Sequence, residues 1–210
     1  MTPTPYQNMM GRKKSTQNDG LDYFPTPPMA LDKLLIELVL HNPDLLPNHM
    51  CWEPACGDGR LSEILHTATG GQSIMSTDIV DRGYKGQDRT LDFLDSDSVF
   101  EMLRAKWHGD ILTNPPFKLA EQFLHQAMKI TGDKSRIYLL LRSMWQESKG
   151  RYERVFSVYP PDYIYQASGR IKFTQGTGKG GGMVPYSWFI WDKAIPNEGK
   201  ETKLRWFNYD

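Results

Sequence analysis

The sequence predicts an α/β fold: a mostly parallel, doubly wound sheet with helices on both faces. Short apolar runs typical of buried strands alternate along residues 50–141 with stretches whose apolar residues recur at helical spacing. A glycine turn joins the first apolar run to the first such helix, as in βα units that bind ligands at the carboxyl ends of parallel strands. The 210 residues, 39% of them hydrophobic, fit one globular domain.

Composition narrows the class of protein. The 25 basic and 25 acidic residues give a formal net charge of zero, so nucleic-acid binding would have to come from local patches. No apolar run is long enough to span a membrane, and the first residues lack the apolar segment of a signal peptide. The two cysteines, Cys51 and Cys56, form a C-x₄-C pair that could in principle bind metal, but no second cysteine pair or paired-histidine motif accompanies it, so zinc is not expected. We therefore expect a cytoplasmic protein that has no metal and no membrane contact; its oligomeric state stays open.

Residues 1–20 are predicted to form a mobile arm, because they are mostly polar and few of them could bury surface. The basic trio Arg12, Lys13 and Lys14 is explained most simply by a solvated tail, with a tether to phosphates as the alternative. We expect residues 21–210 to form a single domain, since the chain contains no internal repeat and leaves no room for a second one.

A helix is predicted over residues 29–40, where leucines recur at helical spacing. Thr26 is a candidate N-cap, and Pro27 or Pro28 would fill the first turn, where a missing N–H costs nothing. This structural interpretation accounts for the stretch without a ligand.

A glycine turn with the sequence EPACGDG occupies residues 53–59. Gly57 and Gly59 would let a ligand approach the backbone closely. The next apolar run ends at Asp78, 19 positions after Gly59, the interval at which a carboxylate can accept hydrogen bonds from ribose hydroxyls. Ser62 stands where a dinucleotide fingerprint has its third glycine. The turn therefore favours a mononucleoside-like ligand over a dinucleotide.

Further elements follow in order. Asp92 is either a loop acid or an acceptor for an adenine amino group, and any of Asp95, Ser96 and Asp97 could cap the helix that follows. The predicted elements are a helix at 99–106, a helix at 119–130, a central strand at 137–141 and closing strands at 188–191 and 204–207.

Residues 163–187 have a different character, with no acidic residue, a cluster of glycines at 176–182 and the cations Arg170, Lys172 and Lys179. This composition predicts a flexible basic loop. We expect this loop to follow a phosphate backbone. A disordered hinge is the alternative.

The predicted strand at residues 110–113 must end at Pro115 and Pro116, because each lacks a backbone N–H. Asn114 is held extended by the proline after it, so its amide oxygen and the carbonyls of Asn114 and Pro115 have no predicted partner in the sheet. Neutral acceptors beside the ring of Phe117 suit a flat group with a poorly nucleophilic NH₂, such as N6 of adenine, whose lone pair they would localise. A Pro-Pro turn capped by asparagine is the alternative.

Taken in order, these motifs resemble the S-adenosylmethionine-dependent DNA adenine-N6 methyltransferases, the small phage-type members above all. The resemblance runs from about residue 22 to 191 and is carried by FPTPP at 24–28, EPACGDG at 53–59, NPPF at 114–117 and RIKF at 170–173. It implies a class I (Rossmann-like) methyltransferase fold, S-adenosylmethionine as cofactor and DNA as partner. Residues 21–210 would then be one catalytic domain without a separate target-recognition domain.

The resemblance also implies roles for particular residues around the cofactor. Those expected to flank its methionine moiety are Tyr23, Thr26, Pro27, Glu53, Ala55, Gly57 and Gly59. Those expected around its nucleoside are Asp78 at the ribose, Ile79 against the adenine, and Asp92 with Phe93 at the adenine amino group.

For the target base, the resemblance implies that Asn114 and Pro115 accept from the amine, within a motif completed by Pro116, and that Phe117 stacks on the flipped base. Phe173 would be a second contact. Two alternatives remain: the same acceptors would serve an RNA adenine or a protein glutamine amide, and the chain could be an inactive cofactor-binding partner subunit.

Overall fold

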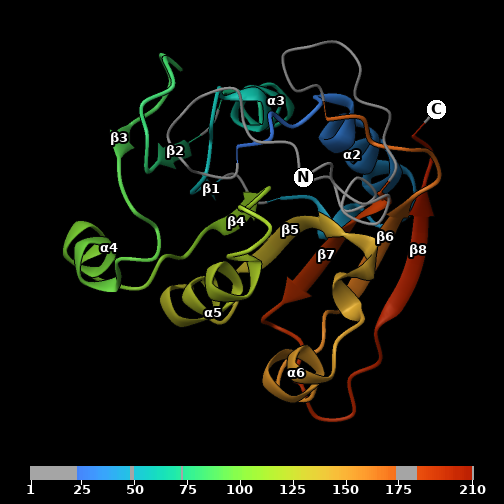
Figure 1. Ribbon diagram of the computed structural model, residues 1–210. Coiled ribbons are helices and arrows are strands. Elements are labelled where there is room, and N and C mark those ends of the chain that lie inside the picture. Colours follow the sequence, from blue (N-terminus) through green and yellow to red (C-terminus); the bar gives the residue numbers. More distant parts are fainter. Residues whose placement is uncertain (1–22, 48–49, 72, 174–183, 210) are drawn as a thin grey trace, which may run out of the picture.

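The computed structural model describes residues 23–47, 50–71, 73–173 and 184–209. Their strands form one eight-stranded sheet in the order β3-β2-β1-β4-β5-β7-β6-β8 (Figure 1). The strands are β1 (Cys51–Glu53), β2 (Ile74–Asp78), β3 (Arg89–Thr90), β4 (Asp110–Thr113), β5 (Arg136–Arg142), β6 (Tyr163–Ala167), β7 (Tyr186–Asp192) and β8 (Lys203–Phe207).

The helices alternate with the strands, as the sequence predicts for residues 50–141. They are α2 (Met29–His41), α3 (Arg60–Ala68), α4 (Ser96–Leu103), α5 (Ala120–Ile130) and α6 (Lys149–Arg151), with 3₁₀ turns at η1 (Pro43–Leu45) and η2 (Ser143–Gln146) and a π-helical turn at η3 (Tyr152–Phe156). Asp95 caps α4 by accepting from the backbone N–H groups of Asp97 and Ser98.

The five strands from β3 to β5 are parallel, and this part of the sheet places the site. β1 pairs with β2 on one side and β4 on the other, and β4 pairs with β5. The carboxyl ends of these strands therefore share one edge. The turn that begins at Pro54, the loop after Asp78 and the Asn114 motif all start at that edge.

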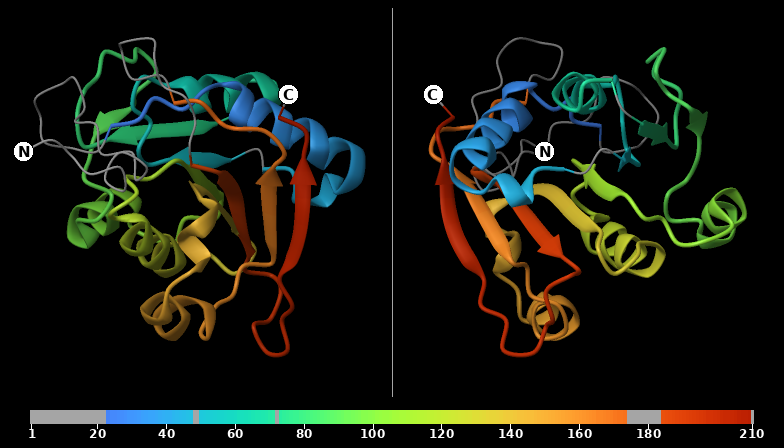
Figure 2. Two further views of the ribbon diagram at one scale, coloured as in Figure 1. Left: turned by 45° about the vertical axis from the view of Figure 1, so that its right-hand side comes forward. Right: turned by 180° about the vertical axis from the view of Figure 1, so that it is seen from behind.

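Helices cover both faces of the sheet, so it has a hydrophobic core on each side (Figure 2). Leu112 and Tyr138 pack into the core beneath α2 and α3, while their neighbours Ile111 and Leu139 pack into the core beneath α4 and α5. The indole of Trp188 donates to the backbone oxygen of Ala30 at 2.8 Å, which fixes the start of α2. The segment before α2 reaches the end of β4, where Phe24 and Thr26 accept hydrogen bonds from Asn114.

The carboxyl-terminal strands correct one sequence-based prediction. Residues 163–187 are not a loop throughout, because Tyr163–Ala167 form β6, antiparallel to β7 and parallel to β8. Tyrosine and isoleucine favour a pleated, half-buried surface, and Gln166 is satisfied there by Ser187, whose hydroxyl donates to it at 2.8 Å. The glycine cluster at 176–182 lies outside the described residues.

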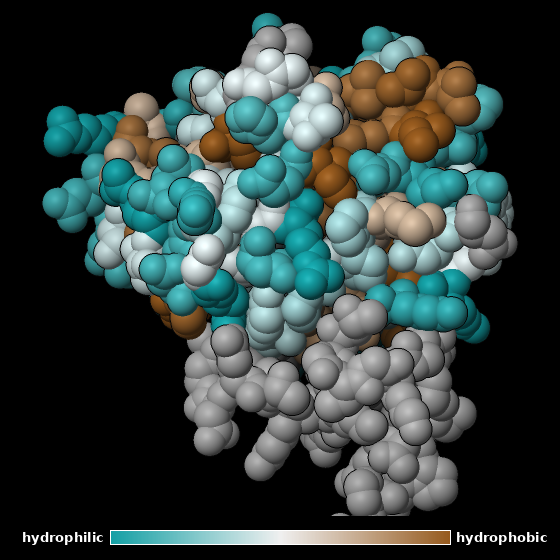
Figure 3. All heavy atoms as spheres, turned by 90° about the horizontal axis from the view of Figure 1, so that it is seen from above, coloured by the Kyte–Doolittle hydropathy of each residue, from teal (hydrophilic) through white to brown (hydrophobic). Residues whose placement is uncertain are grey.

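Apolar side chains gather at one corner of the face shown in Figure 3, which looks down on the side of α2 and α3. The exposed apolar residues of α2 are Met29, Ile36, Val39 and Leu40. Among the described residues, no helix is long and apolar enough to cross a membrane.

Candidate active site

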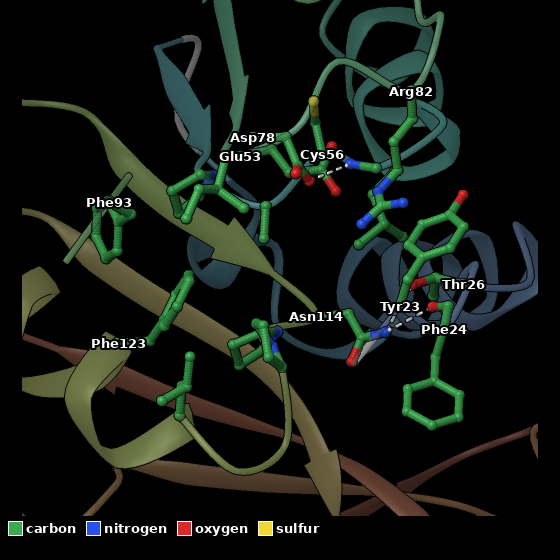
Figure 4. A pocket seen from close by; sticks show the side chains of 18 of the residues that line it. Tyr23, Phe24, Thr26, Glu53, Cys56, Asp78, Arg82, Phe93, Asn114 and Phe123 are labelled. Carbon is green, nitrogen blue, oxygen red and sulfur yellow. Dashed lines mark hydrogen bonds between the residues drawn. The ribbon is translucent and has the colours of Figure 1, made fainter. Parts of the chain in front are cut away.

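A cavity of about 300 Å³ opens at the carboxyl ends of β1, β2 and β4. Figure 4 shows its two ends: Phe93 and Phe123 lie at an apolar end, Tyr23 and Arg82 at a polar end, and Asn114 between them. The sequence-predicted residues that line the cavity are Tyr23, Thr26, Glu53, Ala55, Gly57, Asp78, Ile79, Asp92, Phe93, Asn114, Pro115 and Pro116. Residues from five separate segments of the sequence thus meet in one site.

Asp78 closes the glycine turn. Its Oδ2 accepts from the backbone N–H of Gly57 at 2.8 Å, and its Oδ1 accepts from Val80 at 2.9 Å. Gly57 has φ +57°, and a Cβ there would lie 2.8 Å from the ring of Tyr23. The turn therefore needs glycine both for its backbone and for the space.

Gly59 and Pro27 do not line the cavity. Gly59 has φ +84° and precedes α3, and the ring of Tyr84 lies 2.3 Å from where its Cβ would be. The backbone oxygen of Pro27 accepts from Ala30 at the start of α2. Both residues shape the walls, and their predicted cofactor contacts stay predictions.

Glu53 ends β1 and is 2% exposed. The hydroxyl of Ser62 donates to its carboxyl group and also bonds to the hydroxyl of Ser76 at 2.7 Å. Burial raises the pKa of Glu53 well above its ordinary value, although Ser62 opposes the shift; the nearby carboxyl of Asp78 raises it further. The serine that replaces the third fingerprint glycine thus anchors an acid inside the cavity, a role that its spacing did not reveal.

Asp78→Ala should weaken binding of S-adenosylmethionine by about 1.5–3 kcal/mol, the range for hydrogen bonds to a charged group. It should also lower the free energy of unfolding, because Gly57 and Val80 lose their acceptor. Calorimetry together with urea denaturation separates the two effects. A folded variant with unchanged affinity would remove Asp78 from the cofactor's contacts.

Asn114 is oriented by the segment before α2. Its Nδ2 donates to the hydroxyl of Thr26 at 2.9 Å and to the backbone oxygen of Phe24 at 3.3 Å (Figure 4). Its Oδ1 is buried and has no hydrogen-bond partner among the described residues. The prediction of Thr26 as an N-cap is wrong: Pro28 is the N-cap residue and has no side-chain cap, because the Thr26 hydroxyl serves Asn114 instead.

Phe117 lies outside the cavity, although its neighbours Pro116 and Lys118 line it. Its ring packs against Phe24 at 5.3 Å and Tyr186 at 5.5 Å between centroids, and Phe173 packs on Tyr186 at 4.6 Å. We call Phe24, Phe117, Phe173 and Tyr186 the aromatic cluster. Stacking of Phe117 and Phe173 on a target base stays a prediction.

The apolar end of the cavity rests on the core. Phe93 is 2% exposed and packs against Trp52 and Phe123, with centroid distances of 5.1 and 5.0 Å. Ile79, by contrast, is 47% exposed, and the carboxylate of Asp92 accepts from the N–H of Leu94 at 2.9 Å. A flat apolar group would lie between a buried ring and an exposed aliphatic side chain, with a carboxylate at its edge.

The polar end contains residues that no sequence signal marked. The guanidinium of Arg82 lies 4.0 Å from the centre of the Tyr23 ring, and Arg60 pairs with Asp58 at 2.9 Å. Burial, with a smaller effect of Asp58, raises the pKa of Tyr23 to about 12. Tyr23 is therefore a neutral hydrogen-bonding phenol at physiological pH.

The basic stretch after β6 is described only in part. Arg170 and Lys172 are exposed on either side of the buried Ile171, and Lys179 lies outside the described residues. No group of three or more histidine, cysteine or acidic side chains that could hold a metal occurs in the described part of the chain.

No protein-family profile and no curated protein matches the sequence. Solved structures do match the fold. One is a type I restriction-modification methyltransferase subunit from Streptococcus thermophilus, with 13% identity and a TM-score of 0.62 over 84% of this chain and 46% of that one. Another is a proposed RNA methyltransferase from Pyrococcus horikoshii, with 16% identity and a TM-score of 0.61 over 89% and 95%.

A third is a proposed class I S-adenosylmethionine-dependent methyltransferase from Listeria monocytogenes, with 15% identity and a TM-score of 0.55 over 95% of this chain and 69% of that one. The protein therefore has the class I (Rossmann-like) methyltransferase fold, as the sequence predicts. It spans less than half of the Streptococcus subunit.

Proposed function

We propose that the protein transfers the methyl group of S-adenosylmethionine to the N6 amine of adenine in DNA. The observation that carries this proposal is the amide of Asn114, which is fixed through its nitrogen and presents a buried oxygen with no partner among the described residues. A buried acceptor without a donor is costly. The N–H of a substrate amine would satisfy it.

The cavity fits the cofactor on three counts. Gly57 lines it without a side chain, its apolar end suits an adenine, and the buried carboxyl of Glu53 suits an ammonium group. Glu53 and Tyr23 would hold the methionine end, Asp78 the ribose, and Ile79 and Phe93 the adenine. The cofactor supplies the methyl group, and the N6–CH₃ bond forms as the S–CH₃ bond breaks.

The protein's own contribution is to position the target amine and to polarise it. Asn114 Oδ1 and the carbonyl of Pro115 would accept its two hydrogens, so that the nitrogen lone pair is directed at the methyl group. The amine then loses one proton to water, since no histidine lines the cavity in the described part of the chain. No covalent enzyme intermediate is needed.

DNA is favoured as substrate by the motifs shared with DNA adenine-N6 methyltransferases and by the likeness to a restriction-modification subunit. Exposed Arg170 and Lys172 could contact its phosphates. The likeness to a proposed RNA methyltransferase keeps RNA adenine as the second candidate.

Incubation with methyl-labelled S-adenosylmethionine and separate pools of DNA, RNA and protein tests the proposal. We expect label in DNA, recovered after nuclease digestion as N6-methyladenine. Label in RNA or in protein glutamine would replace DNA as the substrate. Absence of label in every pool, with the cofactor still bound, would identify an inactive cofactor-binding protein.

A further inference from the structure

β5 begins and ends with an arginine, and each of the two has a register partner in β7. In the antiparallel pairing Arg136 is opposite Asp192, and Arg142 is opposite Tyr186. Arg136 Nε donates to Asp192 Oδ2 at 2.9 Å, so its charge is balanced within the sheet. At the other end of the strand, no carboxylate of the described residues forms an ion pair with Arg142.

The guanidinium of Arg142 is nevertheless held in place. Its central carbon lies 4.9 Å from the centre of the Phe117 ring, and its charge is near enough to Tyr186 to oppose the rise that burial causes in the pKa of that hydroxyl. Its Nε is buried and has no hydrogen-bond partner among the described residues. A guanidinium has five N–H donors, and withdrawing a cation from water without a counter-charge is costly. This arrangement would be completed by an anion.

The position of Arg142 indicates which anion this is. β4 and β5 are parallel neighbours with Thr113 opposite Leu139. Asn114, which follows β4, and Arg142, the last residue of β5, therefore lie at the same edge of the sheet on adjacent strands. Arg142 does not line the cofactor cavity, whose arginines are Arg60 and Arg82. An anion at Arg142 would therefore belong to the molecule that presents its amine to Asn114.

We propose that Arg142 binds the backbone phosphate of the nucleotide whose base reaches Asn114. This inference rests on the nucleic-acid substrate of the proposed function. The planar fork of an arginine matches two phosphate oxygens, and the contact with the Phe117 ring holds the guanidinium beside the aromatic cluster. Arg142 is thus a positioning residue that holds the extruded nucleotide by its phosphate while Asn114 holds its amine.

The test uses an oligonucleotide duplex that copies a methylated site from the DNA pool, with a neutral methylphosphonate placed at one phosphate at a time. In the wild type, one substitution next to the target adenine should lower kcat/KM by about tenfold or more, the loss expected for a charge-assisted contact. Arg142→Gln should lower kcat/KM on the unmodified duplex to a similar extent. The same variant should be insensitive to the methylphosphonate at that one position.

Matched variants separate charge from fold. Arg142→Lys keeps the charge but loses the fork, so it should retain sensitivity to that phosphate with reduced kcat/KM. Lys129→Gln removes an exposed charge in the last turn of α5, at the sheet edge opposite to that of Asn114. This variant should behave as wild type. Cofactor affinity should be unchanged in all three.

In binding assays the slope of log affinity against log salt should fall by about 0.9 in Arg142→Gln and stay unchanged in Lys129→Gln. If Arg142→Gln remains as sensitive as the wild type to every methylphosphonate, the assignment of Arg142 is wrong while the proposed function stands. If the wild type modifies no nucleic acid at all, the proposed function and this inference both fall.

Discussion

Asn114→Ala is expected to lower the rate of adenine methylation at least about a hundredfold while leaving the affinity for S-adenosylmethionine nearly unchanged. The oxygen lost is the buried acceptor that we assign to the target amine. Its contribution should appear mainly in the transition state, where the lone pair localises. The measurement is the N6-methyladenine content of digested DNA by mass spectrometry, with calorimetry for the cofactor.

Two further variants test the orientation of this amide. Thr26→Val removes an acceptor for Asn114 Nδ2 but keeps Oδ1, so it should cost less than Asn114→Ala. Asn114→Asp should also be milder than alanine, because one carboxylate oxygen still accepts, although the other then faces the carbonyl of Phe24, the present partner of Nδ2. Methylation by Asn114→Ala at the wild-type rate would overturn the proposed function.

Glu53→Gln should weaken binding of S-adenosylmethionine by about 1.5–3 kcal/mol, the second large effect, because the cofactor's ammonium loses a charged partner. Glu53→Gln should also affect stability in the protein without cofactor. As the pH rises, the variant should become more stable relative to the wild type, although the same substitution weakens cofactor binding. The reason is that the folded state holds the Glu53 carboxyl in a buried place where its charge is disfavoured.

The sign follows from the raised pKa of Glu53. The folded state binds this proton more tightly than the unfolded chain, whose carboxyl has the ordinary pKa of 4.5. The stabilising contribution of Glu53 is therefore fully present below that value and is lost as the pH rises toward the raised pKa. Glu53→Gln should flatten this part of the stability profile.

Urea denaturation at a series of pH values, with and without cofactor, measures both effects of Glu53→Gln. Glu101→Gln, which removes an exposed carboxylate from α4, is the control and should leave cofactor binding unchanged. A Glu53→Gln profile parallel to that of the wild type would show that Glu53 titrates as an ordinary carboxyl. Unchanged cofactor affinity would place the ammonium elsewhere.

Much of this site could be predicted because its parts lie at strand ends that the sequence marks. Gly57, Asp78 and Asn114 each follow an apolar run, and the carboxyl ends of parallel strands meet at one edge. Contacts between distant segments could not be read in the same way. Nothing in the spacing shows that Thr26 serves the amide of Asn114 across 88 positions, or that Phe117 turns into the aromatic cluster.

The error over β6 has a related cause. The lack of acidic residues and the nearby glycine cluster are properties of the whole stretch, whereas strand formation depends on the neighbouring strands with which a segment can pair. Tyr163–Ala167 become ordered because β7 and β8 flank them. Composition was informative for the exposed Arg170 and Lys172 but not for the five residues that the sheet incorporates.

The antiparallel placement of β7 has a consequence for how such a protein could change. Gln166 and Ser187 are register partners, so the connection from β6 to β7 leaves the sheet and returns to it at adjacent points. Lengthening a connection whose ends are already close costs little, about 0.6 kcal/mol for each doubling of a flexible loop. New segments could be grafted between these two strands, beside the Asn114 edge. If the proposed function holds, preference for a nucleic-acid sequence could be acquired or exchanged in this way while Asn114 and the cavity residues keep their positions.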